Sequence, residues 1–157
     1  MEKYADLEHA LQDPSLAIIT DDMTAYEKYC YLASQISMNQ DYDYEGWASV
    51  QAAPWAGIMD GYSICAGYSA AMEYLCKKAN LYCITVSGRI NDVGHAWNLV
   101  KLPEGTYHVD VTWADGTGYV GTPGRYRYFM LTQEQILYDH EIDDDTVATG
   151  VKEFVRI

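Results

Sequence analysis

Residues 63–78 read SICAGYSAAMEYLCKK and combine a helix pattern with a cysteine at the position where the helix starts. Apolar side chains recur at three- and four-residue spacing, which predicts an amphipathic helix from about Cys65 to Lys78. Asn80 supplies a stop for this helix, and the lysines of its last turn suit the negative end of the helix dipole. Gly67 and the small residues around it allow the first turn to pack closely against a sheet. We therefore expect a helix that carries a cysteine at its N-terminus.

The segments before this helix are predicted to be helical as well. Asp22 is a suitable N-cap for a helix that ends near Asn39, and a further helix is expected around residues 3–12. Between Asn39 and Cys65, residues 41–60 contain glycine and proline breaks, which favour an ordered connection with little regular structure.

The segments after the helix are predicted to be mostly strands, because β-branched and aromatic residues alternate there with a period of two. These stretches are YCITVSG (82–88), HAWNLVK (95–101), TYHVDVTW (106–113), RYRYFML (125–131) and the tail VKEFVRI (151–157). Thr132 and Gln135 form a capping-box pattern for a short helix, residues 114–124 form a glycine-rich loop, and the run HEIDDDT (140–146) is expected to be a solvated acidic turn. Helices followed by an antiparallel meander indicate an α+β fold, and we expect one domain over residues 1–157.

The composition limits the partners that the chain is expected to have. The 157 residues carry a formal net charge of -13 at pH 7, and so acidic a surface repels phosphate backbones and anionic lipids. Neither nucleic acid nor membrane insertion is expected, since no apolar run approaches the roughly 20 residues of a membrane span. The first residues lack the pattern of a signal peptide, which leaves an intracellular protein or a domain of an exported protein as alternatives. The oligomeric state stays open.

Cysteine usage argues against a disulfide framework or a zinc site. The four cysteines form no CxxC pair, and their spacing to His95 matches no common zinc pattern, so we expect no metal and no cofactor. Cys30, Cys76 and Cys83 are interpreted as core residues. Cys65 differs because a helix N-terminus lowers the pKa of a thiol below its usual value of about 8.5, and the backbone N–H groups there can hold an oxyanion.

A hairpin downstream brings a base and an acid into consideration. Leu102-Pro103-Glu104-Gly105 is a good type I turn, with proline at its second position and glycine at its fourth. If Leu102 pairs with Gly105, Asp110 becomes a diagonal neighbour of His95 on the same face, with Cα atoms roughly 7 to 8 Å apart. A bulge at Gly105 would instead turn Asp110 to the other face.

These three residues suit covalent catalysis at an acyl carbon. Asp110 would orient the ring of His95, His95 would deprotonate Cys65 and later protonate a leaving amine, and Cys65 would form a thioester. A further oxyanion donor is expected near the cysteine, and Trp55 and Tyr62 are candidates by position only. Trp97 is interpreted as sheet packing that could also wall a cleft beside the base.

The motifs ICAGYSAA, GHAWNLV and YHVDVTW, in this order and spacing, resemble the core of the transglutaminase-like superfamily of papain-type thiol enzymes. The resemblance covers roughly residues 20–140. It implies a helix that bears the catalytic cysteine and packs on an antiparallel sheet, and a Cys-His-Asp triad that maps onto Cys65, His95 and Asp110. It also implies attack on a peptide or protein amide, completed by water, as in a cysteine protease or amidase, or by an amine, as in a transglutaminase. Ala114 stands where bacterial-type members of the family often have an acid, which leaves the triad intact.

Other readings of the same residues stay open. His108 lies two residues from Asp110 on the same predicted strand face, and we interpret it as a hydrogen-bonded sheet residue rather than the base. His140 fits a helix end or a second site. A non-catalytic peptide- or glycan-binding module that retained the fold is the alternative function, and neither the substrate nor the choice between hydrolysis and transfer follows from the sequence.

Overall fold

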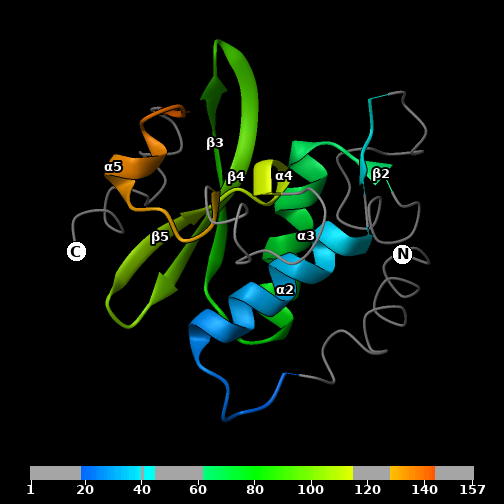
Figure 1. Ribbon diagram of the computed structural model, residues 1–157, viewed down its shortest axis with the longest axis vertical. Helices are drawn as coiled ribbons and strands as arrows, with labels where there is room; N and C mark the ends of the chain where they lie inside the picture. The colour runs from blue at the N-terminus through cyan, green and yellow to red at the C-terminus, as the bar shows by residue number, and fades with distance from the viewer. Residues whose placement is uncertain (1–18, 40, 45–61, 115–127, 144–157) are drawn as a thin grey trace.

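A computed structural model describes most of the region that the motifs cover (Figure 1). The described residues are 19–39, 41–44, 62–114 and 128–143. The helix expected around residues 3–12, the glycine-rich loop beyond Ala114, the tail strand at 151–157 and the candidate Trp55 lie outside these residues.

Two longer helices match the sequence pattern closely. Helix α2 spans Ala25–Asn39 and helix α3 spans Cys65–Lys78, and the end of α2 and both ends of α3 lie where the sequence predicts them. Asp22 as the N-cap of α2 is wrong, because the hydroxyl of Thr24 accepts the backbone N–H of Glu27 at 3.1 Å instead. Within the described part of the chain, no helix combines the length and apolarity that crossing a bilayer requires.

Among the described residues, four strands form an antiparallel sheet in the order β5-β4-β3-β6. They are β3 (Cys83–Ile90), β4 (Val93–Leu102), β5 (Gly105–Val109) and β6 (Glu141–Ile142). A separate parallel pair consists of β1 (Asp41–Tyr42) and β2 (Tyr62–Ser63). The α+β fold class with helices before an antiparallel sheet is therefore correct.

Three segments of the sheet region differ from expectation. The predicted strand 106–113 stops at Val109, and the chain turns into the short helix α4 (Val111–Ala114). Of the predicted strand 125–131, the described residues contribute only an isolated bridge between Leu131 and His108. The run 140–146 is not simply a solvated turn, since its second and third residues form β6, the edge strand beside β3.

The register of the β4–β5 hairpin is the one that a shared face for His95 and Asp110 requires. Leu102 pairs with Gly105 and Asn98 pairs with Val109, so no bulge intervenes at the turn. Gly105 has a φ of 155°, a backbone conformation that residues with a side chain rarely adopt. The turn thus fixes the β4–β5 register, and with it the position of the residues after β5 relative to the start of β4.

The core lies on both faces of the sheet because side chains of β4 alternate between them. Val100 and Leu102 belong to the larger cluster, which is filled from α2 and α3 by residues such as Leu32 and Leu75. On the other face, Trp97 and Leu99 pack with Val86 and with Ile136 of the short helix α5 (Gln133–Ile136). Figure 1 shows α2 and α3 on one side of the strands and α5 on the other.

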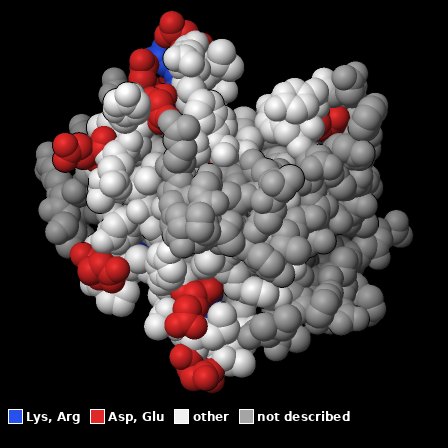
Figure 2. Space-filling view, in the orientation of Figure 1, with Lys and Arg blue, Asp and Glu red and all other residues white. Residues whose placement is uncertain are grey.

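The capping box predicted at the start of α5 is present. The hydroxyl of Thr132 accepts the backbone N–H of Gln135, and the side chain of Gln135 accepts the backbone N–H of Thr132. Acidic side chains account for most of the charged surface that is visible in Figure 2, as the net charge of -13 requires.

Candidate active site

Cys65 is the first residue of α3, so its thiol lies at the end of the helix where backbone N–H groups lack helical partners. Ile64 precedes it in an extended conformation and provides no side-chain cap. The thiol is partly buried and hydrogen-bonds with His95. Although burial, the largest single influence, raises the pKa of Cys65, the bonds to His95 and to the backbone of Ala96, together with the charge of His95, lower it below its usual value.

His95 lies near the start of β4, opposite Gly88 of β3. Its Nε2 is 2.7 Å from Oδ2 of Asp110, which leaves Nδ1 as the nitrogen that can face the thiol. Burial lowers the pKa of His95, but the hydrogen bonds and charges of Asp110 and Cys65 outweigh it and raise the pKa to about 9. The raised pKa of the ring therefore lies beside a thiol whose pKa is lowered.

Asp110 follows β5 directly, and its side chain is completely buried. Its Oδ1 accepts the backbone N–H of Trp113 at 3.2 Å, which makes it the N-cap of α4 and explains why the strand ends here. Its Oδ2 accepts from both His95 and His140, each at 2.7 Å. Burial raises the pKa of Asp110, but the bonds from the two imidazoles lower it below its usual value, so the buried carboxylate stays ionised.

His140, between α5 and β6, is the member of this cluster that the sequence did not reveal. Its ring is fully buried, with Nε2 on Asp110 and Nδ1 at 2.6 Å from Oδ1 of Asp139. Thirty positions, which include the short helices α4 and α5, separate it from Asp110, so no strand register connects the two in the sequence. The only signal was that a histidine is adjacent to an acid at the end of a capped helix.

The three side chains His95, Asp110 and His140 offer ligand atoms within 4.8 Å of one another, an arrangement that invites comparison with a metal site. Two ligands of one tetrahedral zinc at about 2.0–2.1 Å lie roughly 3.3 Å apart. Both nitrogen-to-Oδ2 distances here are 2.7 Å, the length of a charge-assisted hydrogen bond. The described geometry is that of a hydrogen-bonded cluster.

Comparison with known proteins identifies the fold of the chain. No protein-family model matches the chain. A crystal structure of a transglutaminase superposes with a TM-score of 0.57 at 19% identity, covering 72% of this chain and 32% of that one. A candidate cysteine protease from Cytophaga hutchinsonii superposes with a TM-score of 0.53 at 17% identity, covering 70% of this chain and 37% of that one. The chain has a transglutaminase-like fold.

Sequence similarity to curated proteins points the same way over a shorter stretch. The kyphoscoliosis peptidases of Mus musculus and Homo sapiens are each 39% identical over 37% of this chain. The chain spans about a tenth of the length of these relatives, at 10% of each. The resemblance to transglutaminase-like proteins is thus confirmed for the fold.

Trp97 and His108 form a second buried pair beside the candidate site. The indole N–H of Trp97 donates to Nδ1 of His108 at 2.9 Å, so His108 carries its proton on Nε2 and donates it to Oε1 of Gln133 at 2.7 Å. His108 is a hydrogen-bonded sheet residue, as interpreted from the sequence. The Trp97 side chain is 1% exposed and its N–H is already donated, so no proton of the indole is left for an oxyanion. For Tyr62, the structure describes its backbone in β2.

Burial of His108 should make the stability of the folded chain depend on pH in the acidic range. Burial lowers the pKa of His108 to about 4, whereas an unfolded histidine titrates near 6.5. Between these values the unfolded state binds a proton that the folded state excludes, so stability falls as the pH drops from about 6.5 to 4. We expect a loss on the order of 3 kcal/mol, measured by urea unfolding across this range. In His108→Asn the slope in this window should disappear, and an unchanged slope would contradict the assignment.

Aromatic rings enclose the two imidazoles of the cluster. The ring of His140 packs edge-on against Trp97 and Trp113, with centroids 4.9 and 5.6 Å away. Trp113 also contacts the ring of His95 and packs edge-on against Tyr128. These rings exclude water from the Asp110 carboxylate, which strengthens each hydrogen bond that it accepts.

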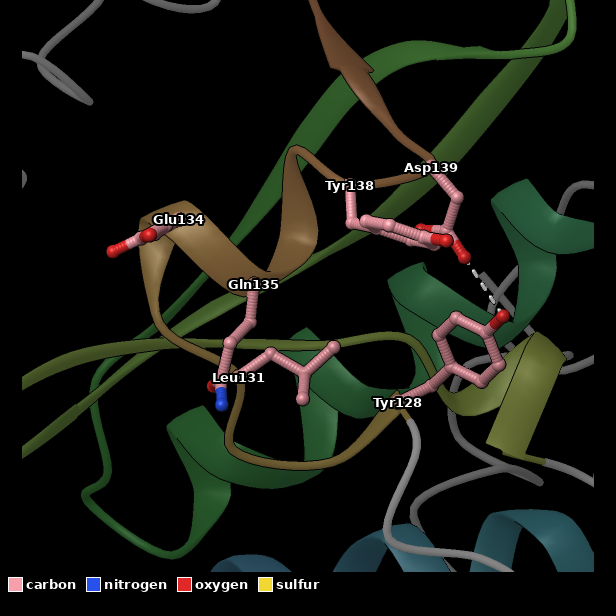
Figure 3. A pocket seen from close by; sticks show the side chains of 6 residues that line it. All are labelled: Tyr128, Leu131, Glu134, Gln135, Tyr138 and Asp139. Atoms are coloured by element: carbon pink, nitrogen blue, oxygen red, sulfur yellow. Dashed lines mark hydrogen bonds between the residues drawn. The ribbon is translucent and has the colours of Figure 1, made fainter.

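A pocket of about 370 Å³ is lined by α5 and by the segments before and after it (Figure 3). Its lining residues are Tyr128, Leu131, Glu134, Gln135, Tyr138 and Asp139. In Figure 3 the Tyr128 hydroxyl points to Asp139, and it donates to Oδ2 of that residue at 2.8 Å. Asp139 therefore joins the pocket wall to His140 and, through it, to Asp110.

Proposed function

We propose that the chain catalyses thiol-dependent acyl transfer on peptide or protein amides through a thioester at Cys65. The observation that supports this most directly is the 2.7 Å hydrogen bond between His95 and the buried carboxylate of Asp110, beside a thiol at the start of α3 whose pKa His95 lowers. A lowered thiol pKa beside a raised imidazole pKa is what a thiolate–imidazolium nucleophile requires.

Each residue has one role in the proposed reaction. The Cys65 sulfur attacks the amide carbonyl carbon, and the backbone N–H groups at the start of α3 lie near the developing oxyanion. As the C–N bond breaks, His95 gives its proton to the leaving amine. Water or a second amine then attacks the thioester and gives its proton to His95, and the thiolate leaves. Asp110 holds the ring and stabilises its charge throughout.

The chain contains its own control for the first test of this function. Cys30 is partly buried like Cys65, but burial raises the pKa of its thiol despite a hydrogen bond with Ser34. With iodoacetamide at pH 6.5, we expect Cys65 of the folded protein to be labelled at least tenfold faster than Cys30, as measured by peptide mass spectrometry. Equal rates would contradict the proposal and favour a non-catalytic binding module.

The fate of the thioester needs a separate measurement. A dansylated amine offered with a glutamine-bearing protein reports transfer, and a panel of fluorogenic peptides reports hydrolysis. Cys65→Ala supplies the blank for both assays.

A further inference from the structure

The Asp110 carboxylate accepts hydrogen bonds from two imidazoles, and the proposed function uses only one of them. Oδ2 of Asp110 lies 2.7 Å from Nε2 of His95 and 2.7 Å from Nε2 of His140. His140 does not contact Cys65 in any described interaction, so it has no direct part in attack on a substrate. It nevertheless binds the same oxygen atom that orients the proposed base.

We propose that His140 is a positioning residue that fixes the Asp110 carboxylate for His95 and is itself held by Asp139. The proposal rests on the roles given above to Cys65, His95 and Asp110. It extends the proposed triad into a continuous hydrogen-bonded chain from the thiol to Asp139, where the hydroxyl of Tyr128 binds the last carboxylate.

The donors and acceptors along this series of hydrogen bonds support the assignment. An ionised carboxylate only accepts hydrogen bonds, so every nitrogen that faces one must carry a hydrogen. His140 faces Asp110 with Nε2 and Asp139 with Nδ1, and its ring therefore bears a positive charge when both bonds form. Charges then alternate in sign from the Cys65 thiolate to Asp139, and each buried charge has an opposite neighbour.

Because Asp110 and His140 are buried, losing the hydrogen bond between them costs more than losing van der Waals packing. The side chains of Asp110 and His140 are both 0% exposed, so no water replaces a hydrogen bond that is lost between them. Without the second donor, the carboxylate keeps only His95 and the N–H of Trp113 and is held less firmly against rotation about its last bond. The ring of His95 would then lose its fixed orientation toward the sulfur.

Two amide substitutions separate the bond to Asp110 from the bond to Asp139. The amide nitrogen of glutamine falls near Nε2 of a histidine, whereas that of asparagine falls near Nδ1. In His140→Asn we expect the pH midpoint of Cys65 alkylation to rise by about one unit, with labelling at pH 6.5 about tenfold slower. In His140→Gln we expect less than half of this shift, because a donor to Asp110 remains.

The matched control is His108→Asn, which removes a buried imidazole that does not touch Asp110. It should lower stability but leave the midpoint of Cys65 within about 0.3 units of wild type. The other titratable groups that face this series of hydrogen bonds are Tyr42 beside Cys65, His108 beside Trp97, and Tyr128 beside Asp139. None of them is altered in the His140 variants. A midpoint that stays constant or falls in His140→Asn, or equal shifts in both His140 variants, would overturn the proposal.

A second measurement keeps this test independent of enzyme activity. The proton on Nε2 of His95 is followed by ¹⁵N-edited NMR in wild type and in His140→Gln, the variant that retains the donor. The resonance should persist in both and should broaden or disappear in His140→Asn. If Cys65 of the wild type labels no faster than Cys30, the proposed function fails, but this resonance still decides whether His140 positions Asp110. Should His140→Asn not fold, loss of the resonance in His140→Gln overturns the proposal, and its retention supports it.

Discussion

Replacement of His95 by alanine is expected to lower the rate of Cys65 acylation by about 10³-fold or more, the range seen when a catalytic base is removed. The hydrogen bond and charge of His95 lower the thiol pKa against burial, together with the backbone of Ala96 and Ala66, so the thiolate fraction near neutral pH should fall in the variant. The leaving amine would also lose its proton donor. Stopped-flow measurement of thioester formation with an activated ester and with an amide substrate checks both effects.

In His95→Ala the rate of thioester formation should fall more with the amide substrate than with the activated ester, because an ester with a good leaving group needs no protonation. Free imidazole at millimolar concentration should restore part of the rate, since it can enter the space that the ring occupied. A rate within tenfold of wild type on the amide would exclude His95 as the general base and acid.

Replacement of Gly88 by alanine is expected to produce a large loss of stability for a single added methyl group. A Cβ at this position would lie 1.9 Å from the backbone oxygen of Glu141 and 2.5 Å from the ring of Trp97. The backbone oxygen belongs to β6 and cannot move away as a flexible side chain would. We expect the free energy of unfolding in urea to fall by about 2–3 kcal/mol as β6 is displaced.

The same displacement should reach the candidate site, because His140 immediately precedes β6. Gly94→Ala is the matched control, since Gly94 lies on the neighbouring strand and an added Cβ there meets no atom within 4 Å. It should change stability by no more than about 0.5 kcal/mol. If the two alanine variants were equally stable, the close approach of β6 to β3 would be wrong.

Local patterns in the sequence were sufficient for the elements that carry Cys65 and His95. The bounds of α3 follow from its apolar spacing, and the β4–β5 register is one of the two that the turn with proline and glycine left open. A one-residue change in that register would have moved Asp110 to the opposite face. These elements are determined by interactions between residues close in sequence, which a single sequence records.

The parts that the sequence did not predict depend on contacts between distant residues. The alternation in YHVDVTW favours a strand, but Asp110 caps α4 and the strand ends. Residues 128–131 have β-forming side chains, yet they bond to the chain around His108 and Asp110 without forming a longer strand. The position of His140 depends on where β6 joins the sheet, and nothing in its own neighbourhood specifies that edge.

The three hydrogen bonds at Asp110 explain why this position needs an acid rather than an amide. Two imidazole nitrogens donate to one carboxylate oxygen, and the backbone N–H of Trp113 donates to the other. A carboxamide has only one accepting end, so either flip of the group would direct an NH₂ at an existing donor. Only an ionised carboxylate accepts hydrogen bonds on both oxygens, so the three hydrogen bonds that hold this part of the fold require a buried negative charge at position 110.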